Sequence, residues 1–281
     1  MDKRESLINK YFALVTGASQ GIGLAICESL ARRKHNLIMV SLPNEQIAEK
    51  ASSITMMYGV EVFFYETDLT VLENCSQLID VINSKHYIVN ILINNAGIGS
   101  NGAFTRFPPG FYEKQIAINC QAPVYLCRLM IPEMLKLKKA HIVNMASLGA
   151  FFDMPHKEVY VASKSFIISF SRSLYVYLKN TSIKVSIICP GSVDSNIRMK
   201  EIHKEMKGIG KKSVMLPSAV AEASIKAMFA EKKMFIPGKI NRILYWVNKI
   251  IPEFIQRYIV DREMYRQELL SQYAAEKLHK V

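Results

Sequence analysis

The segment FALVTGASQGIG, residues 12–23, contains an apolar run that ends in a cluster of three glycines. Gly17, Gly21 and Gly23 follow the strand-like run FALVT and open a stretch of helical periodicity. Glycines at this spacing let the backbone turn tightly, approach a pyrophosphate and begin a helix whose positive end faces the phosphates. A plain strand–turn–helix connection also favours glycine, so the rest of the chain has to decide between the two interpretations.

Short apolar runs alternate with longer segments of helical periodicity along most of the chain. The runs that predict strands are FALVT, NLIMV, VEVFFYE, VNILIN, HIVNM, KVSIIC and KMFIP. The helices predicted between them lie near residues 21–34, 44–58, 70–85, 110–138, 158–180 and 217–231. This alternation is typical of repeated β-α-β units. We therefore predict an α/β fold with a doubly wound parallel sheet, whose ligand lies beyond the carboxyl ends of the strands.

The composition predicts one domain with a C-terminal extension. The chain has 281 residues, half of them hydrophobic, which is enough to bury one large core. No linker rich in Ser, Gly or Pro divides it. We assign residues 1–237 to a nucleotide-binding domain that includes a substrate lid at 192–215, and residues 238–281 to an amphipathic helical extension.

Neither a membrane span nor a metal site is predicted. The sequence contains no window of about 18 uncharged apolar residues and no secretory signal, which favours the cytoplasm. The five cysteines are widely spaced, without a C-x-x-C pair, and are interpreted as reduced, mostly buried thiols.

The positive charge is concentrated near the C-terminus. The formal net charge is +12, and residues 196–281 hold seventeen Lys and Arg against nine Asp and Glu. A basic surface favours an anionic partner. Because no nucleic-acid-binding motif or aromatic platform accompanies the charge, we expect no nucleic-acid partner.

Three segments far apart in the chain supply the groups that carbonyl reduction requires. Ser147 follows the predicted strand HIVNM, and Tyr160 and Lys164 are four residues apart on the next helix, hence on one face. Reduction of a ketone needs a proton donor beside the carbonyl oxygen, and a nearby ammonium lowers the pKa of a tyrosine. The same spacing recurs at Tyr175/Lys179 and Tyr245/Lys249, which we interpret as helix surface.

Residues after the second and third strands bear on the cofactor. The second strand ends at Ser41 without a carboxylate, and Arg32, Arg33 and Lys34 lie on the preceding helix end, so NADP(H) is favoured over NAD(H). Asp68 is placed to accept from an adenine amino group, or to cap a helix, or both. Asn94 to Gly97 supply small residues beside the cofactor, or a tight turn.

These motifs, taken together, resemble the short-chain dehydrogenase/reductase family over roughly residues 10–237. The resemblance implies a Rossmann-type fold, NAD(P)(H), and a catalytic tetrad of Asn119, Ser147, Tyr160 and Lys164. Lys164 is also implied to bind the nicotinamide ribose, and Asn119 to anchor a water that links Lys164 to solvent. The cofactor-binding residues that the resemblance implies are Thr16, Gly17, Ser19, Gly21, Ile22, Gly23, Ser41, Asp68, Leu69, Asn95, Ala96, Gly97, Tyr160, Lys164, Pro190, Gly191, Val193 and Ser195.

The C-terminal third of the sequence contains the segments expected to contact the substrate. The lid is rich in Met, which adapts to irregular apolar ligands, although an ordinary surface loop is an equal alternative, and His203 is interpreted as a lid surface residue. Residues 238–259 carry apolar residues at helical spacing with cations between them, and Pro252 is expected to break the helix. Such a stripe packs on its own domain or on another subunit more often than on an anionic membrane, the alternative being peripheral contact with the inner membrane face.

The main prediction is an NADP(H)-dependent reductase of an apolar ketone. The segment PGKINR and the apolar stretch after it resemble a subgroup that reduces long-chain substrates, such as 3-ketoacyl or 3-ketosphinganine-type ketones. A steroid-like or xenobiotic ketone and a catalytically silent nucleotide sensor are the alternatives. The family resemblance also implies a homodimer or homotetramer that pairs through the helices at 110–138 and 158–180.

Overall fold

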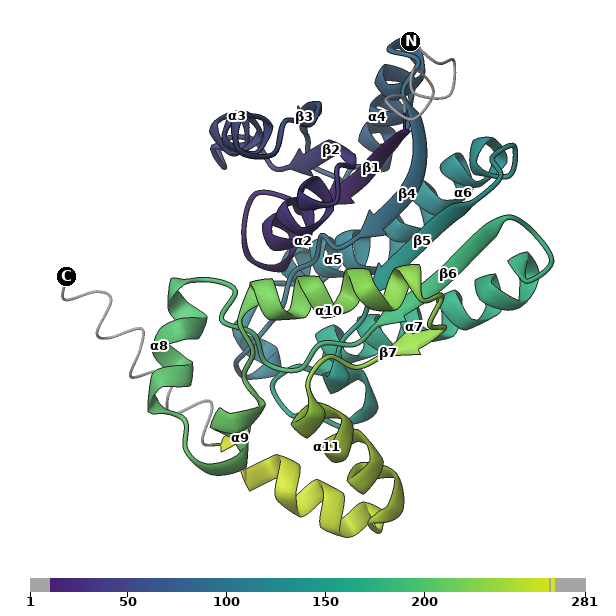
Figure 1. Ribbon diagram of the computed structural model, residues 1–281. Coiled ribbons are helices and arrows are strands. Elements are labelled where there is room, and N and C mark those ends of the chain that lie inside the picture. The colour runs from purple at the N-terminus through teal and green to yellow at the C-terminus, as the bar shows by residue number, and fades with distance from the viewer. Residues whose placement is uncertain (1–10, 263, 266–281) are drawn as a thin grey trace.

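The computed structural model describes residues 11–262, 264 and 265, and these residues form one seven-stranded parallel sheet with helices on both faces (Figure 1). The strands are β1 (Tyr11–Thr16), β2 (Asn36–Ser41), β3 (Val62–Glu66), β4 (Ile88–Asn94), β5 (Ala140–Met145), β6 (Ile183–Ile188) and β7 (Met234–Phe235). Their order across the sheet is β3-β2-β1-β4-β5-β6-β7, and every neighbouring pair is parallel. The predicted doubly wound sheet is confirmed.

The helices cover the sheet in two layers. The longer helices are α2 (Gly21–Arg32), α3 (Ile47–Tyr58), α4 (Leu72–Ser84), α5 (Pro109–Ile116), α6 (Ala122–Met134), α7 (Glu158–Leu178), α10 (Pro217–Phe229) and α11 (Lys239–Ile250). One apolar core joins the sheet to α2, α3 and α10, and another joins it to α4, α6 and α7. Strands buried on both faces explain why the sequence shows continuous apolar runs there.

Shorter elements interrupt the regular pattern near the carboxyl ends of the strands. They are η1 (Phe104–Arg106), a π-helical turn η2 (Ala117–Gln121), η3 (Leu148–Phe151), α8 (Ile197–Glu205) and α9 (Gly208–Ser213). The predicted helix over 110–138 is therefore α5, η2 and α6 in succession. Residues 253–262 are helical as well, and Pro252 separates them from α11, as predicted.

The segment predicted as a lid, residues 192–215, is closed at its base and carries α8 and α9. A parallel bridge joins Val193 to Met215, and the N–H of Met215 donates to the carbonyl of Ser192 at 3.0 Å. The helix α9 contacts α11, and both α8 and α9 lie below the carboxyl edge of the sheet (Figure 1).

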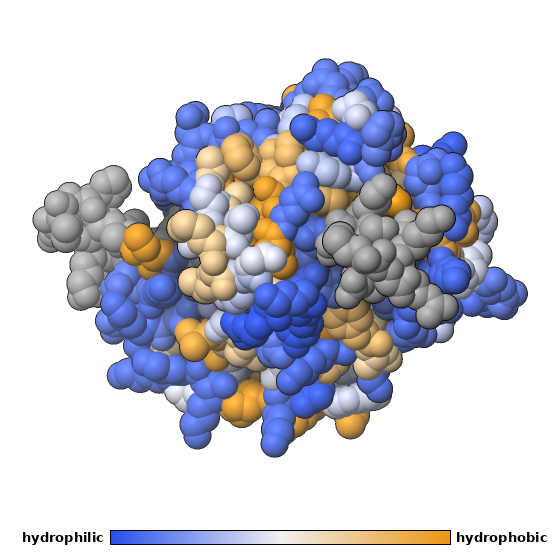
Figure 2. Space-filling model, turned by 45° about the horizontal axis from the view of Figure 1, so that its top comes forward, coloured by the Kyte–Doolittle hydropathy of each residue, from blue (hydrophilic) through white to orange (hydrophobic). Residues whose placement is uncertain are grey.

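The surface is mostly polar with local apolar areas. Figure 2 shows one face on which hydrophilic residues surround a band of apolar residues across its middle. All five cysteines are free and buried, as predicted. Among the described residues, no helix is long and apolar enough to cross a membrane, and no cluster of His, Cys, Asp or Glu could hold a metal.

Candidate active site

The turn between β1 and α2 requires glycine at three positions. Gly17 and Gly21 adopt positive φ angles of 63° and 56°. A Cβ atom at Gly23 would lie 2.0 Å from the carbonyl oxygen of Gly17, so α2 begins directly against the turn. The backbone N–H groups at the start of α2 are thereby presented beyond the sheet edge, where a pyrophosphate fits.

A clamp of hydrogen bonds joins the glycine turn to the end of β4. The Thr16 hydroxyl accepts from the backbone N–H groups of Asn95 and Ala96, at 3.0 Å each. The Asn95 side chain donates to the carbonyls of Thr16 and Gly17 at 2.9 and 3.2 Å. Thr16 and Asn95 therefore fix two loops of the predicted cofactor site to each other.

Asp68 lies in the turn before α4. Its carboxylate accepts from the backbone N–H of Thr70 at 2.9 Å, while the residue that caps α4 is Val71. The expected helix-cap role is therefore wrong, because Asp68 stabilises a turn just outside the helix. Its neighbour Leu69 is buried.

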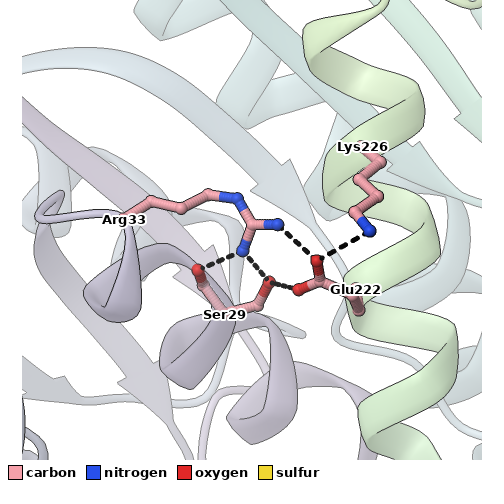
Figure 3. Close-up of polar contacts among 4 residues, drawn as sticks. All are labelled: Ser29, Arg33, Glu222 and Lys226. Carbon is pink, nitrogen blue, oxygen red and sulfur yellow. Dashed lines mark hydrogen bonds and ion pairs between the residues drawn. The ribbon is translucent and has the colours of Figure 1, made fainter.

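The basic residues expected beside the adenosine ribose lie at the wrong edge of the sheet. Arg32, Arg33 and Lys34 precede β2, whereas Ser41 ends it, roughly 17 Å further along the strand. Arg33 instead forms an ion pair with Glu222 of α10 at 2.5 Å, with Ser29 and Lys226 beside it (Figure 3). Lys34 donates to the carbonyl of Tyr58 at 2.6 Å. These three residues give no support for NADP(H).

The end of β2 has a different set of polar contacts from the one predicted. The Ser41 side chain is buried and donates to the carbonyl of Leu42 at 2.9 Å. The carboxylate of Glu45, four residues further on, accepts a hydrogen bond from the Ser19 hydroxyl of the glycine turn. A carboxylate therefore does reach the predicted adenosine end of the site, although none ends the strand.

Ser147, Tyr160 and Lys164 come together at the carboxyl ends of β5 and β6. Burial raises the pKa of Tyr160, and a side-chain hydrogen bond with Ser147 acts in the opposite direction. Lys164 is 7% exposed, and its ammonium donates to the carbonyl of Met145 at 2.9 Å. Burial lowers the pKa of Lys164 to about 8. The prediction that Lys164 lowers the pKa of Tyr160 is thus wrong for this arrangement, in which burial dominates both residues.

Asn119 lies in the π-helical turn η2, and its side chain is fully engaged. Its amide oxygen accepts from the N–H of Ile98 at 2.9 Å. Its amide nitrogen donates to the carbonyl of Ile98 and to the hydroxyl of Ser163, at 3.0 and 2.9 Å. A water anchored by this residue would therefore have to use its backbone, and π-helical turns of this kind are frequent at functional sites.

One cavity of about 1010 Å³ contacts much of the predicted site. The predicted residues that line it are Ile22, Asn95, Gly97, Ser147, Tyr160, Lys164, Pro190, Gly191, Val193 and Ser195. The predicted residues outside its lining are Thr16, Gly17, Ser19, Gly21, Gly23, Ser41, Asp68, Leu69, Ala96 and Asn119. Asn119 nevertheless lies next to the cavity wall, because it packs against Gly97, which lines the cavity. A Cβ at Gly97 would lie 2.9 Å from the Asn119 amide oxygen and 3.3 Å from the Lys164 ammonium.

Two polar residues of the cavity wall, His203 and Asn241, were not predicted as site residues from the sequence. His203 of α8 is only 5% exposed, and its Nδ1 lies 2.6 Å from the Asp194 carboxylate, so the prediction of a surface residue is wrong. Asn241 of α11 is buried against Gly191, where a Cβ would meet its amide oxygen at 2.6 Å. No spacing in the sequence links 203 to 194 or 241 to 191. The fold of the lid brings the first pair together, and the packing of α11 brings the second pair together.

Replacing the buried ammonium is expected to stabilise the fold. We expect Lys164→Met to raise the free energy of unfolding at neutral pH by on the order of 2 kcal/mol, because the pKa of Lys164 lies below its ordinary value. Between about pH 8 and the ordinary pKa, the unfolded chain binds more protons, so the wild type gains stability as pH rises and the variant does not.

Denaturant unfolding at neutral pH and near pH 10 measures both effects. The exposed Lys136→Met is the control, and its difference from wild type should be small at both pH values. If Lys164→Met were less stable than wild type at neutral pH, burial of the Lys164 ammonium would not destabilise the folded state as we expect.

Comparison with known proteins agrees with this geometry. The sequence profile described as short chain dehydrogenase matches residues 11–206. An uncharacterized oxidoreductase of Staphylococcus saprophyticus is 30% identical over 216 residues, which cover 77% of this chain and 90% of that protein. D-beta-hydroxybutyrate dehydrogenase of Cupriavidus necator is 30% identical over 196 residues, or 70% and 76% of the two chains.

A solved structure extends the similarity to the fold. The bulky-bulky ketone specific alcohol dehydrogenase from Comamonas testosteroni superposes with a TM-score of 0.72 at 25% identity. The match covers 87% of this chain and 96% of that one.

Proposed function

The chain belongs to the short-chain dehydrogenase family, and from that membership we propose that it reduces an apolar, lipid-like ketone to an alcohol. It is an oxidoreductase that interconverts alcohols and carbonyl compounds with NAD(P)(H). The observation that carries the substrate proposal is the cavity, which is lined by Ser147 and Tyr160 together with many apolar side chains. These apolar side chains include Met199, Ile202 and Met206.

Each member of the proposed tetrad has a distinct task. The nicotinamide, when bound, supplies the hydride to the carbonyl carbon. Tyr160 donates the proton to the carbonyl oxygen, and Ser147 holds that oxygen by a second hydrogen bond. The Lys164 ammonium would hold the ribose of a bound nicotinamide nucleotide, close to Tyr160. Asn119 positions the loop at Ile98 and the helix at Ser163 around them.

The nucleotide end of the proposed site consists of the glycine turn and the loops clamped to it. Gly17, Gly21 and Gly23 place the first N–H groups of α2 beside the pyrophosphate. Thr16 at the end of β1 and Asn95, Ala96 and Gly97 after β4 support the glycine turn. Asp68 and Leu69 would flank the adenine. The segment from Pro190 to Ser195 covers the nicotinamide.

The apolar character of the cavity favours long or bulky ketones. Flexible Met side chains adapt to irregular apolar ligands, and Leu244 and Ile259 of the C-terminal helices extend the wall outwards. A similar protein is named for bulky-bulky ketones. We therefore place 3-ketoacyl and 3-ketosphinganine-type ketones first, followed by steroid-like ketones.

The experiment that tests this function is cofactor oxidation across a panel of ketones. The panel runs from short acyl to long-chain sphingoid and steroid ketones, with NADPH and NADH in parallel. The proposal expects kcat/KM to rise with apolar size. Turnover confined to small polar ketones would contradict the substrate class, and nucleotide binding without turnover on any ketone would favour a sensor.

The preference between the two nucleotides depends on Glu45. The sequence predicted NADP(H), but the cations behind that prediction lie at the opposite edge of the sheet. The Glu45 carboxylate is bonded to Ser19, where a ribose 2′-phosphate would meet a like charge and a 2′-hydroxyl would meet an acceptor. We therefore propose that Glu45 selects NAD(H), in place of the NADP(H) preference predicted from the sequence.

Glu45→Gln is expected to shift the nucleotide preference towards NADPH. Removing the carboxylate leaves the Lys50 ammonium, which donates to the Glu45 carbonyl at 2.7 Å, and the Glu66 carboxylate, which accepts from the N–H of Asn44 at 3.2 Å. The ratio of kcat/KM for NADPH over NADH should rise at least about tenfold. The control is Glu49→Gln, which removes a carboxylate from the first turn of α3. An unchanged ratio in Glu45→Gln would remove Glu45 from the nucleotide site.

Assembly, domain division and location are parts of the proposal as well. Tyr125 of α6 and Phe166, Val176 and Tyr177 of α7 are exposed apolar side chains on the two helices expected to pair. We propose a homodimer or homotetramer through these helices, which mass measurement in solution tests. The division near residue 237 and a cytoplasmic location also remain proposals.

A further inference from the structure

The helix α11 is turned so that its more polar side faces the protein. Asn241, Tyr245 and Asn248 are its buried residues, spaced at i, i+4 and i+7. The amide of Asn248 donates to the carbonyl of Phe151 at 2.8 Å, and the ring of Tyr245 packs edge-on against Phe151 at 4.8 Å. These contacts, together with Asn241 against Gly191, fix which side of α11 points outwards.

The outward side of α11 is an apolar stripe. Ile243, Trp246, Val247 and Ile250 follow the i, i+3, i+4, i+7 pattern and are all exposed, Ile250 by 80% and Trp246 by 60%. A helix of a globular protein normally turns such a stripe towards its own core. The expectation that the stripe packs over its own domain is therefore wrong for these four residues.

The helix at 253–262 continues the same surface. The Gln256 amide donates to the carbonyls of Asn248 and Ile251, at 2.8 Å each, and so ties this helix to the end of α11. Its exposed apolar residues form two pairs that lie one helical turn apart, Phe254 with Ile255 and Tyr258 with Ile259. We define the C-terminal apolar face as Ile243, Trp246, Val247, Ile250, Phe254, Ile255, Tyr258 and Ile259.

Positive charge surrounds the C-terminal apolar face. Residues 239–262 contain five Lys and Arg against Glu253 and Asp261, and Glu253 is already paired with Arg257 at 2.5 Å. The Lys249 ammonium lies over the rings of Tyr245 and Trp246, at 4.8 and 5.3 Å from their centroids. An amphipathic surface with an aromatic residue and peripheral cations has the composition of an interfacial membrane helix.

From this arrangement we propose that the C-terminal apolar face binds the surface of an anionic lipid membrane. Its apolar side chains enter the boundary between headgroups and acyl chains, and Lys239, Arg242 and Lys249 contact lipid phosphates. A second copy of the chain fits the face less well, because a two-fold contact would bring the same cations of both copies together.

The bound orientation also places the catalytic cavity at the lipid. Tyr258 and Ile259 belong to the C-terminal apolar face and also line the cavity, as does Leu244 of α11. An apolar substrate dissolved in the membrane would therefore enter without crossing water. This entry route depends on the proposed function, whereas the membrane contact does not.

Vesicle flotation of the full-length protein tests the membrane contact. The vesicles contain phosphatidylglycerol with phosphatidylcholine, or phosphatidylcholine alone. We expect the wild type to float with the anionic vesicles, and Trp246→Glu/Ile250→Glu to lower the bound fraction at least about tenfold. Met56→Glu is the matched control, since Met56 is 83% exposed on α3, remote from the face. Unchanged melting temperatures establish that both variants fold.

A charge variant and a mass measurement complete the test. Arg242→Glu/Lys249→Glu should reduce anionic binding while leaving the apolar residues in place, and added salt should weaken wild-type binding in the same way. Equal flotation of wild type and Trp246→Glu/Ile250→Glu would overturn the proposal. A second pair of results would also overturn it: the wild type does not float, and the solution mass of Trp246→Glu/Ile250→Glu is half that of the wild type. The face would then be a subunit interface. No substrate is present, so failure here is distinct from failure of the enzymatic proposal.

Discussion

Tyr160→Phe is expected to lower kcat for ketone reduction by about 10²–10⁴-fold, the usual contribution of a positioned proton donor. The affinity for the nucleotide should stay close to wild type, because the removed hydroxyl hydrogen-bonds Ser147 and not the glycine turn. Steady-state kinetics with a long-chain ketone measures the first effect, and titration of the nucleotide by intrinsic fluorescence measures the second.

The chain provides a matched control for this prediction. Tyr175 and Lys179 have the same spacing on the same helix, but Tyr175 packs under the Lys233 ammonium at 4.6 Å, away from the cavity. Tyr175→Phe should retain wild-type kcat. A Tyr160→Phe enzyme with near wild-type turnover, or a Tyr175→Phe enzyme that loses it, would remove Tyr160 from the proposed chemistry.

Gly23→Ala is expected to abolish nucleotide binding and to destabilise the fold. The added Cβ would lie 2.0 Å from the Gly17 carbonyl and 2.6 Å from the Asn95 amide nitrogen, both far inside van der Waals contact. Relief requires α2 to move away from the turn, which removes the N–H groups that would bind phosphate and breaks the clamp at Asn95. Overpacking of this kind costs typically about 1–3 kcal/mol.

The thermal midpoint and the nucleotide dissociation constant are the two readouts of Gly23→Ala. Gly110→Ala is the control, because Gly110 lies in the first turn of α5 with nothing within 4 Å of an added Cβ. We expect that control to bind nucleotide normally and to be as stable as wild type or slightly more. Normal binding in Gly23→Ala would mean that the turn adapts and that its tightness is not required.

The fold could be predicted because local and global signals agree. The strands β1 and β2 are buried on both faces, so their sequences are continuous apolar runs and do not alternate between apolar and polar residues. The strand ends then follow from the runs, and with them the positions of Thr16 and Ser147. The handedness of β-α-β crossovers limits which face of the sheet each helix covers, whereas the order of the strands across the sheet was not predicted.

Side-chain contacts between distant segments could not be predicted in the same way. Arg33 is close to Ser41 in sequence, but a whole strand separates them, and its partner Glu222 is 189 residues away. Glu45 was overlooked because it lies beyond the strand end, where loop geometry decides which way the carboxylate points. His203 and Asn241 are likewise buried only because α8 and α11 fold back over the cavity.

Tyr160 and Lys164 illustrate the limit of spacing arguments about pKa. Four residues on a helix place the two side chains on one face, but the Lys164 ammonium donates to the Met145 carbonyl and is buried there. Burial then disfavours the charged form of both groups. The sequence identifies the residues, whereas their protonation depends on how deeply the fold encloses them.

Transfer of deuterium from nicotinamide to a ketone tests the proposed reaction most directly. The enzyme is incubated with NADH or NADPH deuterated at the transferring carbon and a long-chain ketone, and the product is analysed by mass spectrometry. We expect the wild type, but not Tyr160→Phe, to form an alcohol that carries deuterium on its carbinol carbon. Bound nucleotide that stays deuterated while every ketone is recovered unchanged would contradict the proposed reaction.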